Sequence, residues 1–278
     1  MKHSELRRKC ATYLEDLIGA VKSENSNGVL LDYLGFCARF HRYSFRNRLL
    51  IWMAKPDATH VAGFGTWKKL GRFVKKREKG IPIFAPMRVT RRPEPELEED
   101  LNEEDDVPFF KVVYVWDVSQ TDGKALPEAP DTLGVIGSAG HILPALEDLV
   151  RSKGIVLEYA DTPHGAHGVS KMGRITVLPS TNDEERFSIL AHELGHELLH
   201  GVQERMNLSR KVKELEAEAT AYIVCRHFGL ETKSPSYLAL YRVEELDIRA
   251  SLDRIVSTSS TIIQGAQVQT GERQRKVA

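Results

Sequence analysis

Hydrophobic residues recur at helical spacing in the first third of the chain. From Leu6 to Val21 the apolar positions return every third or fourth residue, which predicts an amphipathic helix. A second helical stretch follows from Leu30. A third runs from Ser44, its capping residue, to Ala54.

Other stretches predict strands. After glycine and proline punctuation, "IPIFAPMRV" alternates in the manner of a strand. The β-branched and aromatic run "FFKVVYVWDVS", from Phe109 to Ser119, predicts a buried strand that completes the sheet of a first domain. Further along, "IVLEYA" and "GRITVLPS" predict two strands around an intervening loop.

Three further helices are predicted in the second half. "ILPALEDLVRSKG" reads as a helix that ends at Gly154. The next begins near Thr181, with Glu184 as the glutamate of a capping box. "KVKELEAEATAYIVCRHFG" predicts a long helix closed by Gly229.

These elements predict an α+β protein of two domains, which suits a length of 278 residues. The expected boundaries are a first domain over 1–122, a linker over 123–140, a second domain over 141–264 and a flexible tail over 265–278. Residues 93–108 hold nine acids and no base, which predicts a disordered insertion within the first domain.

Composition narrows the class of protein. With 41% hydrophobic and 28% charged residues, a packed, soluble globular chain is expected. The three cysteines lack CxxC spacing, which argues against a disulfide framework and favours a reducing cytoplasm. Glu15 and Asp16 interrupt the first apolar stretch, so it is not a signal peptide, and no apolar run is long enough to span a membrane.

The stretch "ILAHELGHELLH" carries the chemistry. His192 and His196 are four residues apart, so on a helix both imidazoles can bind one tetrahedral zinc ion. Glu193 can accept a proton from water at that zinc, as a metallopeptidase requires. Chance spacing on a surface helix is the alternative. The apolar pattern of the helix argues against it, because buried ring nitrogens need partners.

A catalytic zinc takes a third protein ligand, and the next helix offers Glu214, Glu216 and Glu218. Glu216 and Glu218 face nearly opposite sides of a helix. We favour Glu216, which shares a face with small or apolar residues, and keep Glu218 as the alternative; either can also be an ordinary solvated acid. His200 can assist the metal site or the substrate, or it can be a capping or solvent-facing histidine.

The first half is strongly basic. Residues 37–92 contain fifteen bases and two acids, a net charge of +13, which favours a polyanionic partner and salt-dependent binding to phosphates. Interleaved aromatic residues can stack the bases of a single strand, although any one of them can equally belong to the core. The aromatics are Tyr43, Phe45, Trp52, Phe64, Trp67 and Phe73, and the candidate DNA contacts are Arg42, Arg46, Asn47, Lys68, Lys69, Lys75 and Lys76.

Two resemblances add to this interpretation. "FSILAHELGHELLH" followed by "ELEAEATAYIV" resembles the ImmA/IrrE family of bacterial zinc metallopeptidases, over roughly residues 155–230. That resemblance implies a compact zincin-like domain. It also implies zinc ligands at His192, His196 and Glu216, and a general base at Glu193.

The stretch from "YSFRNRLL" through "TWKKLGRFVKKREKGIPIFAP", together with "VYVWDVSQTDG", is similar to the N-terminal domain of ArdC-like antirestriction proteins. This resemblance implies binding of single-stranded DNA by residues 6–122, joined to a zinc-peptidase-like domain, as on plasmids and other mobile elements.

We therefore expect a DNA-associated zinc endopeptidase that acts on a protein or peptide and has no membrane partner. One alternative is a protein that protects single-stranded DNA by coating it and carries a non-catalytic metal site. Another is a regulator that cleaves or sequesters one repressor. Glu193 favours catalysis, because a structural metal site needs no base at that position.

Overall fold

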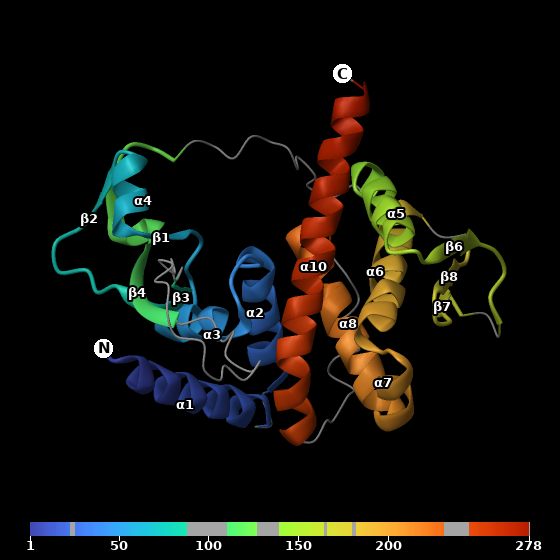
Figure 1. Cartoon of the computed structure of the whole chain (residues 1–278), viewed down its shortest axis with the longest axis horizontal. Coiled ribbons are helices and arrows are strands. Elements are labelled where there is room, and N and C mark those ends of the chain that lie inside the picture. The colour runs from blue at the N-terminus through green and yellow to red at the C-terminus, as the bar shows by residue number, and fades with distance from the viewer. Residues whose placement is uncertain are drawn as a thin grey trace, which may run out of the picture. The chain divides into compact units, whose positions relative to one another are not determined.

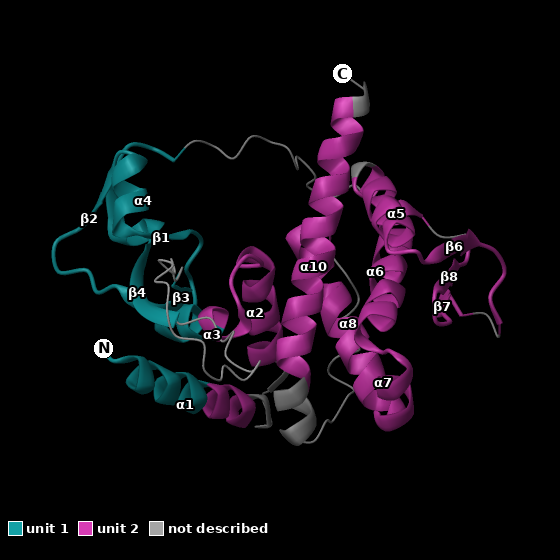
Figure 2. Cartoon of the chain, viewed as in Figure 1, with its two compact units in different colours: residues 1–13, 49–126 teal, residues 14–48, 127–278 magenta. Residues whose placement is uncertain are grey.

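The computed structural model describes residues 1–22, 26–87, 110–126, 139–163, 166–179, 182–230 and 245–277 (Figure 1). It contains two compact units (Figure 2): unit 1 comprises residues 1–13 and 49–126, and unit 2 comprises 14–48 and 127–278. Both hold helices and strands, so the predicted α+β class is confirmed. The predicted acidic insertion lies outside the described residues, as does most of the predicted linker.

Unit 1 is built on an antiparallel sheet of order β1-β4-β3 and a two-stranded ribbon, β2-β5. The predicted strand at 109–119 is confirmed as β4, which stands at the centre of the sheet. It was expected to be buried, but of its residues only Val115 and Asp117 are. The elements are β1 (Val61–Gly63), α4 (Phe64–Lys69), β2 (Arg72–Val74), β3 (Ile81–Pro86), β4 (Phe110–Asp117), η1 (Val118–Gln120) and β5 (Thr121–Gly123). Two helices run from one unit into the other: α1 (His3–Lys22) and α3 (Phe45–Ala54).

Trp67 fastens α4 to the sheet of unit 1. Its side chain is buried, and its indole Nε1 donates a hydrogen bond to the carbonyl oxygen of Trp116 in β4 at 2.9 Å. A buried indole that has found its partner contributes packing area as well as a hydrogen bond. The sequence left open whether each aromatic residue stacks bases or belongs to the core, and Trp67 belongs to the core.

Asp117, at the end of β4, organises the turns of unit 1. Its Oδ1 accepts from the backbone N–H groups of Thr59 at 2.8 Å and His60 at 3.0 Å, and its Oδ2 accepts from that of Ser119 at 2.9 Å. Burial acts to raise the pKa of Asp117, but these hydrogen bonds outweigh it and hold the pKa below its usual range. The adjoining Gln120 donates to Glu78, so this corner also supports the basic turn after β2.

We expect Asp117→Asn to lower the free energy of unfolding by about 2 kcal/mol at neutral pH, because hydrogen bonds to a charged acceptor are lost. The folded pKa is depressed, so this contribution is present above the unfolded pKa and is lost as pH falls through the folded pKa. Urea denaturation across a pH series measures the free energy of unfolding of the parent chain and of the variant, and the two values should converge in acid. Asp122→Asn, at an exposed site on β5, is the control. A stability gap that does not change with pH would contradict the assignment.

Unit 2 combines helices with a small sheet of order β6-β8-β7, in which β6 is parallel and β7 antiparallel to β8. Its helices are α2 (Ser26–Arg39), η2 (Ala139–His141), α5 (Leu143–Ser152), α6 (Asp183–Leu199), α7 (Val202–Asn207), α8 (Arg210–His227) and α10 (Glu245–Val277). Its strands are β6 (Val156–Tyr159), β7 (Gly168–Ser170) and β8 (Arg174–Val177).

Unit 2 departs from the sequence prediction at two elements. Strand β7 lies in the stretch expected to be a loop. Helix α6 is capped by Asn182, which accepts from the backbone N–H of Glu185 at 2.8 Å, whereas Glu184 accepts from Ala139 at 3.3 Å. The expected start at Thr181 lies outside the described residues.

The expected flexible tail is instead the last part of α10. Ile262, Ile263 and Ala266 are fully buried. Gly265 packs against α5 so closely that an added Cβ would lie 2.5 Å from Cδ1 of Leu149. The polar sequence of this segment concealed buried positions as far as Ala266, and beyond them Arg273 pairs with Asp148 of α5. The helix continues to Val277.

The closest approach of α6 and α8 sets the position of the candidate site. A Cβ on Gly195 would lie 3.4 Å from the Cα of Ala217, so two small residues let the backbones come together. Ser209 caps α8 by accepting from the N–H of Val212 at 3.3 Å. The first half of α8, which carries Glu214, Glu216 and Glu218, is thereby placed beside the histidines of α6.

Cys10, Cys37 and Cys225 are buried and free. Among the residues that the structure describes, every helix is too short or too polar to cross a bilayer.

Candidate functional site

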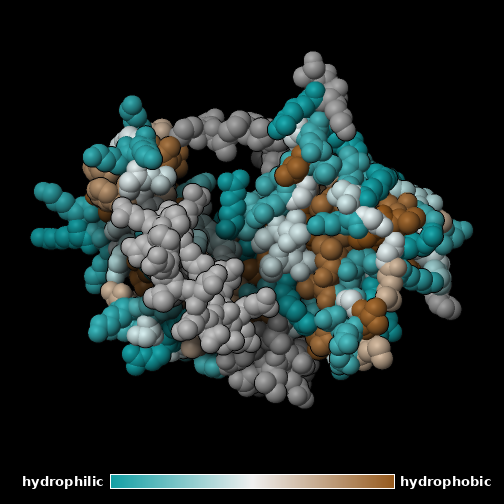
Figure 3. All heavy atoms as spheres, viewed as in Figure 1, coloured by the Kyte–Doolittle hydropathy of each residue, from teal (hydrophilic) through white to brown (hydrophobic). Residues whose placement is uncertain are grey.

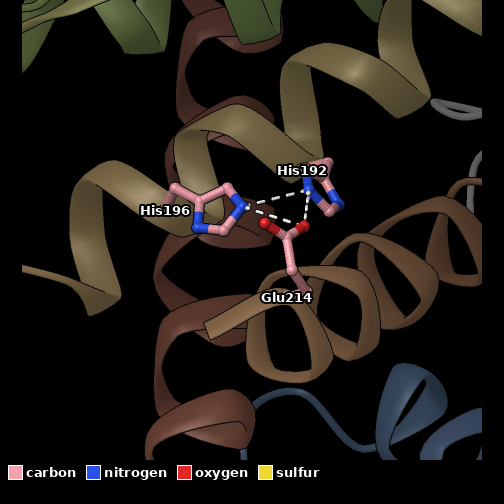
Figure 4. A group of neighbouring side chains, drawn as sticks. All are labelled: His192, His196 and Glu214. Atoms are coloured by element: carbon pink, nitrogen blue, oxygen red, sulfur yellow. Dashed lines mark hydrogen bonds and ion pairs between the residues drawn. The ribbon is translucent and has the colours of Figure 1, made fainter. Parts of the chain in front are cut away.

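His192 and His196 of α6 converge with Glu214 of α8 (Figure 4). The two imidazole Nε2 atoms lie 3.1 Å apart. Oε2 of Glu214 lies 3.6 Å from Nε2 of His192 and 3.7 Å from Nε2 of His196. Ligand atoms about 2.0–2.2 Å from one tetrahedral ion lie about 3.3–3.6 Å apart, so this spacing fits a single metal ion.

The proton positions also fit a metal. Nδ1 of His192 lies 2.9 Å from a carboxylate oxygen of Glu218. An ionised carboxylate only accepts, so Nδ1 carries a proton and Nε2 is the nitrogen that faces the centre of the site. Metal-binding histidines typically donate their second ring nitrogen to such a partner.

The electrostatics of the site favour a bound positive charge. Burial lowers the pKa of His192, but hydrogen bonds to Glu214 and Glu218 outweigh it and raise the pKa to about 10. Hydrogen bonds from His192 and His196 in turn lower the pKa of Glu214. Burial lowers the pKa of His196. The neighbouring glutamates thus favour an additional proton on His192, and a divalent cation can take the place of that proton.

The third member of the group is Glu214, whereas the sequence analysis favoured Glu216. Glu216 is fully buried on another face of α8, where it contacts His200, Ser251 and Arg254. Glu218, the alternative, touches His192 from outside the group.

The signal that could have identified Glu214 is the small residue Ala217. Glu214 and Glu218 are four residues apart and flank Ala217 on one face of α8. Ala217 is where α6 approaches, opposite Gly195. The face of α8 that carries this small residue between two acids is thus the face that contacts α6.

Glu193 lies beside the metal group and against β7. A Cβ on Gly168 would lie 2.8 Å from Oε1 of Glu193, so only glycine leaves room for this carboxylate. Burial raises the pKa of Glu193 to about 7, and His192 opposes the rise. Because β7 is the last strand in the sheet order β6-β8-β7, an extended peptide can pair with its edge next to Glu193.

In unit 1 the predicted DNA contacts lie on an exposed surface. Lys68 and Lys69 end α4, Lys75 and Lys76 follow β2, and all four are exposed. The described residues 49–87 and 110–126 hold ten bases and four acids, a net charge of +6. Figure 3 shows hydrophilic side chains projecting beside hydrophobic atoms at the left edge, where Figure 1 draws β2 and the turn that follows it.

Two aromatic residues of unit 1, Phe64 and Phe73, are exposed. Phe73 is 59% exposed and Phe64 is 54% exposed, whereas Trp67 is buried. Phe73 projects from β2 on the opposite side from Arg72 and Val74, which are half-buried. The two phenylalanines thus remain candidates for stacking.

The other predicted DNA contacts belong to unit 2. Arg42 and Arg46 are exposed, but Asn47 is only 8% exposed. The seven candidates are therefore divided between the two units, and Asn47 presents little surface to a ligand. The aromatics Tyr43, Phe45 and Trp52 are half-buried.

Comparison with known sequences finds a family match in the first part of the chain. Residues 18–116 match the family model of the N-terminal domain of anti-restriction factor ArdC. The chain is 27% identical over 302 residues to an uncharacterized protein of Bacillus anthracis, an alignment that covers 94% of this chain and 51% of that protein. The chain thus spans about half the length of this curated relative.

Comparison with solved structures gives the antirestriction protein ArdC from the R388 plasmid. Its Mn(II)-bound crystal structure is 17% identical with a TM-score of 0.53, covering 95% of this chain and 97% of that chain. Its metal-free structure is 19% identical with a TM-score of 0.49, covering 83% and 86%. The likeness to the Mn(II)-bound protein shows a shared fold over nearly the whole chain.

Proposed function

We propose that this ArdC-like chain is a DNA-associated metallopeptidase: it binds single-stranded DNA, hydrolyses peptide bonds, and acts in antirestriction. The observation that carries the peptidase is the convergence of His192, His196 and Glu214 beside Glu193. The Mn(II)-bound ArdC protein of similar fold supports a divalent ion. We propose zinc as that ion, because two imidazoles and a carboxylate are a common donor set of catalytic zinc.

The residues around the site supply the parts of a hydrolytic reaction. Zinc held by His192, His196 and Glu214 would polarise the peptide carbonyl and make a water molecule more acidic. Glu193 accepts the proton of the attacking water and passes it to the departing amine. Among the described strands β7 pairs with β8 alone, and Arg205 donates to the carbonyl oxygen of Ser170 in β7. The other backbone groups along this edge would align an extended peptide by hydrogen bonds, which places one peptide bond near Glu193.

The second candidate is a DNA-coating protein with a metal site that does no chemistry, which the basic surface alone would explain. Metal analysis of the purified chain, with casein hydrolysis measured with and without single-stranded DNA, separates the two. We expect about one zinc per chain, the stoichiometry of one catalytic site, together with hydrolysis. A zinc-loaded chain that leaves casein intact under both conditions would favour the coating protein.

DNA binding is proposed from the exposed basic and aromatic side chains of unit 1, and the family model at 18–116 supports it. Lysines attract phosphates without reading sequence. Exposed Phe64 and Phe73 offer faces on which unpaired bases stack, at about 1–3 kcal/mol per base. A duplex hides its base faces, so the combination favours single strands.

We expect Lys68→Glu with Lys76→Glu to weaken single-strand binding and to lower the slope of log affinity against log salt by roughly 0.7 for each phosphate that the protein no longer neutralises. Lys75 is less suitable, because its Nζ donates to the carbonyl oxygen of Ser119 at 2.9 Å. Fluorescence anisotropy of a labelled oligonucleotide across a salt series measures both quantities. Lys153→Glu with Lys171→Glu, exposed in unit 2, is the charge-matched control.

Phe73→Ala separates stacking from charge. It should weaken single-strand binding while the salt slope stays unchanged, because the substitution removes no positive charge. Binding to duplex of the same length should change little. An equal loss for duplex and single strand would remove the stacking half of the proposal.

A further inference from the structure

His200 and Glu216 lie behind the metal group, to which His200 is joined through His196. Nδ1 of His196 lies 3.0 Å from Nδ1 of His200, and Nε2 of His200 lies 2.9 Å from Oε2 of Glu216. The side chains of His200 and Glu216 are both completely buried. A continuous chain of hydrogen bonds therefore leads from Glu216 to a candidate metal ligand.

The far end of this chain is held by α10. Ser251 donates to Oε1 of Glu216 at 2.5 Å, and the Arg254 guanidinium donates to the same oxygen. Arginine and a hydroxyl held at this distance fix Glu216 as an acceptor. Three helices thus meet at one carboxylate: α8 carries it, α10 fixes one oxygen, and His200 at the end of α6 takes the other.

The backbone fixes His200 as well. Its N–H donates to the carbonyl oxygen of His196 at 3.0 Å, and its own carbonyl oxygen accepts from Nε of Arg205 at 2.8 Å. The imidazole therefore has little freedom to turn away from its two partners.

The direction of each hydrogen bond follows from Glu216. Because Glu216 accepts, Nε2 of His200 donates to it, and Nδ1 of His200 is left with a lone pair. That lone pair accepts from Nδ1 of His196. Nε2 of His196 then carries no proton and is free to bind a cation.

We infer that His200 and Glu216 are positioning residues, which set the tautomer and orientation of His196 so that its Nε2 faces the metal. The inference rests on the proposed metal site. It gives Glu216 a different role from a ligand, and it makes α10 part of the metal centre although it supplies no ligand to the group. Outer partners of this kind typically contribute about 10–100-fold to metal affinity.

Glu216→Gln is the most direct test because it preserves size. Arg254 only donates, so the amide oxygen must face α10 and the amide NH₂ must face His200. His200 then accepts at Nε2 and donates at Nδ1, which forces the proton of His196 onto Nε2. We expect zinc affinity, measured by chelator competition, to fall about 10–100-fold. Nitrogen-15 NMR of the imidazoles in the metal-free protein should show His196 protonated at Nε2.

Glu197→Gln is the matched control. Glu197 is also a nearly buried acid that accepts from a serine and an arginine, Ser170 and Arg205, but it has no hydrogen bond to His196. It should leave the tautomer of His196 and the zinc affinity unchanged. A purely structural role for Glu216 would give similar results for the two variants.

A double-mutant cycle isolates the path through His200. In a His200→Leu background, Glu216→Gln should cause no further loss of zinc affinity, because its effect passes through the missing imidazole. Should His200→Leu fail to fold, the NMR tautomer of His196 in Glu216→Gln decides alone. Unchanged affinity and tautomer in Glu216→Gln would overturn the relay, whereas failure of the parent chain to bind zinc would instead overturn the proposed metal site.

Discussion

A chain with His192→Ala is expected to bind no zinc at micromolar metal, whereas the parent chain binds one ion. Only two other ligands remain in the group, and a pair cannot hold the ion in the fixed geometry that gives three ligands their affinity. His196→Ala should behave in the same way. Metal content after dialysis, measured with circular dichroism to show that the fold persists, checks both variants.

The same measurement distinguishes the acids of α8. Glu214→Gln removes a proposed ligand and should reduce zinc binding more than Glu218→Gln, which alters only the partner of His192. A loss of about 10–100-fold is expected for Glu218→Gln, the range for partners of a ligand histidine. If Glu218→Gln has the larger effect, Glu218 is the ligand and the geometry assigned to Glu214 is wrong.

Glu193→Gln is expected to keep the zinc and to lose roughly 10²–10⁴-fold in the rate of peptide hydrolysis, the usual contribution of a general base. Glutamine has nearly the same shape as glutamate, so it fits the space beside Gly168, but it cannot accept the proton. Turnover of casein or a quenched peptide by zinc-loaded protein, with metal content measured on the same sample, gives both quantities. Hydrolysis at the parental rate would exclude Glu193 as the base.

Much of the fold follows from local patterns. The β-branched and aromatic content of residues 109–119 predicts β4, and the apolar spacing in residues 142–154 predicts α5, because each signal lies within the element itself. Strand β7 has only three residues, too few for any alternation to be seen. The end of α10 reads as polar because its buried stripe is narrow, and its partner Leu149 lies far away in sequence.

The residues of the candidate site likewise differ in how far the sequence alone predicts them. His192, Glu193 and His196 belong to one helix, where spacing alone determines that they share a neighbourhood. The choice among the acids of α8 depends on which face meets α6, and that is set by the contact of Gly195 with Ala217. Sequence spacing shows which acids share a face, but it does not show which face the neighbouring helix covers.

The two units are interleaved along the chain. Residues 14–48 belong to the unit that carries the metal group, although they precede most of the unit that carries the predicted lysines. The ArdC family model, over 18–116, therefore includes α2, whose Leu34, Phe36 and Cys37 are fully buried in unit 2.

A single exchange of gene segments between residues 14–48 and the rest of unit 2 would separate α2 from the residues against which it packs. Recombination could transfer the proposed DNA-binding part to a new partner only if it carried the proposed metal-binding part with it. The two proposed activities would consequently be inherited together, and natural variants are expected to lose one of them by point substitution rather than by loss of a module.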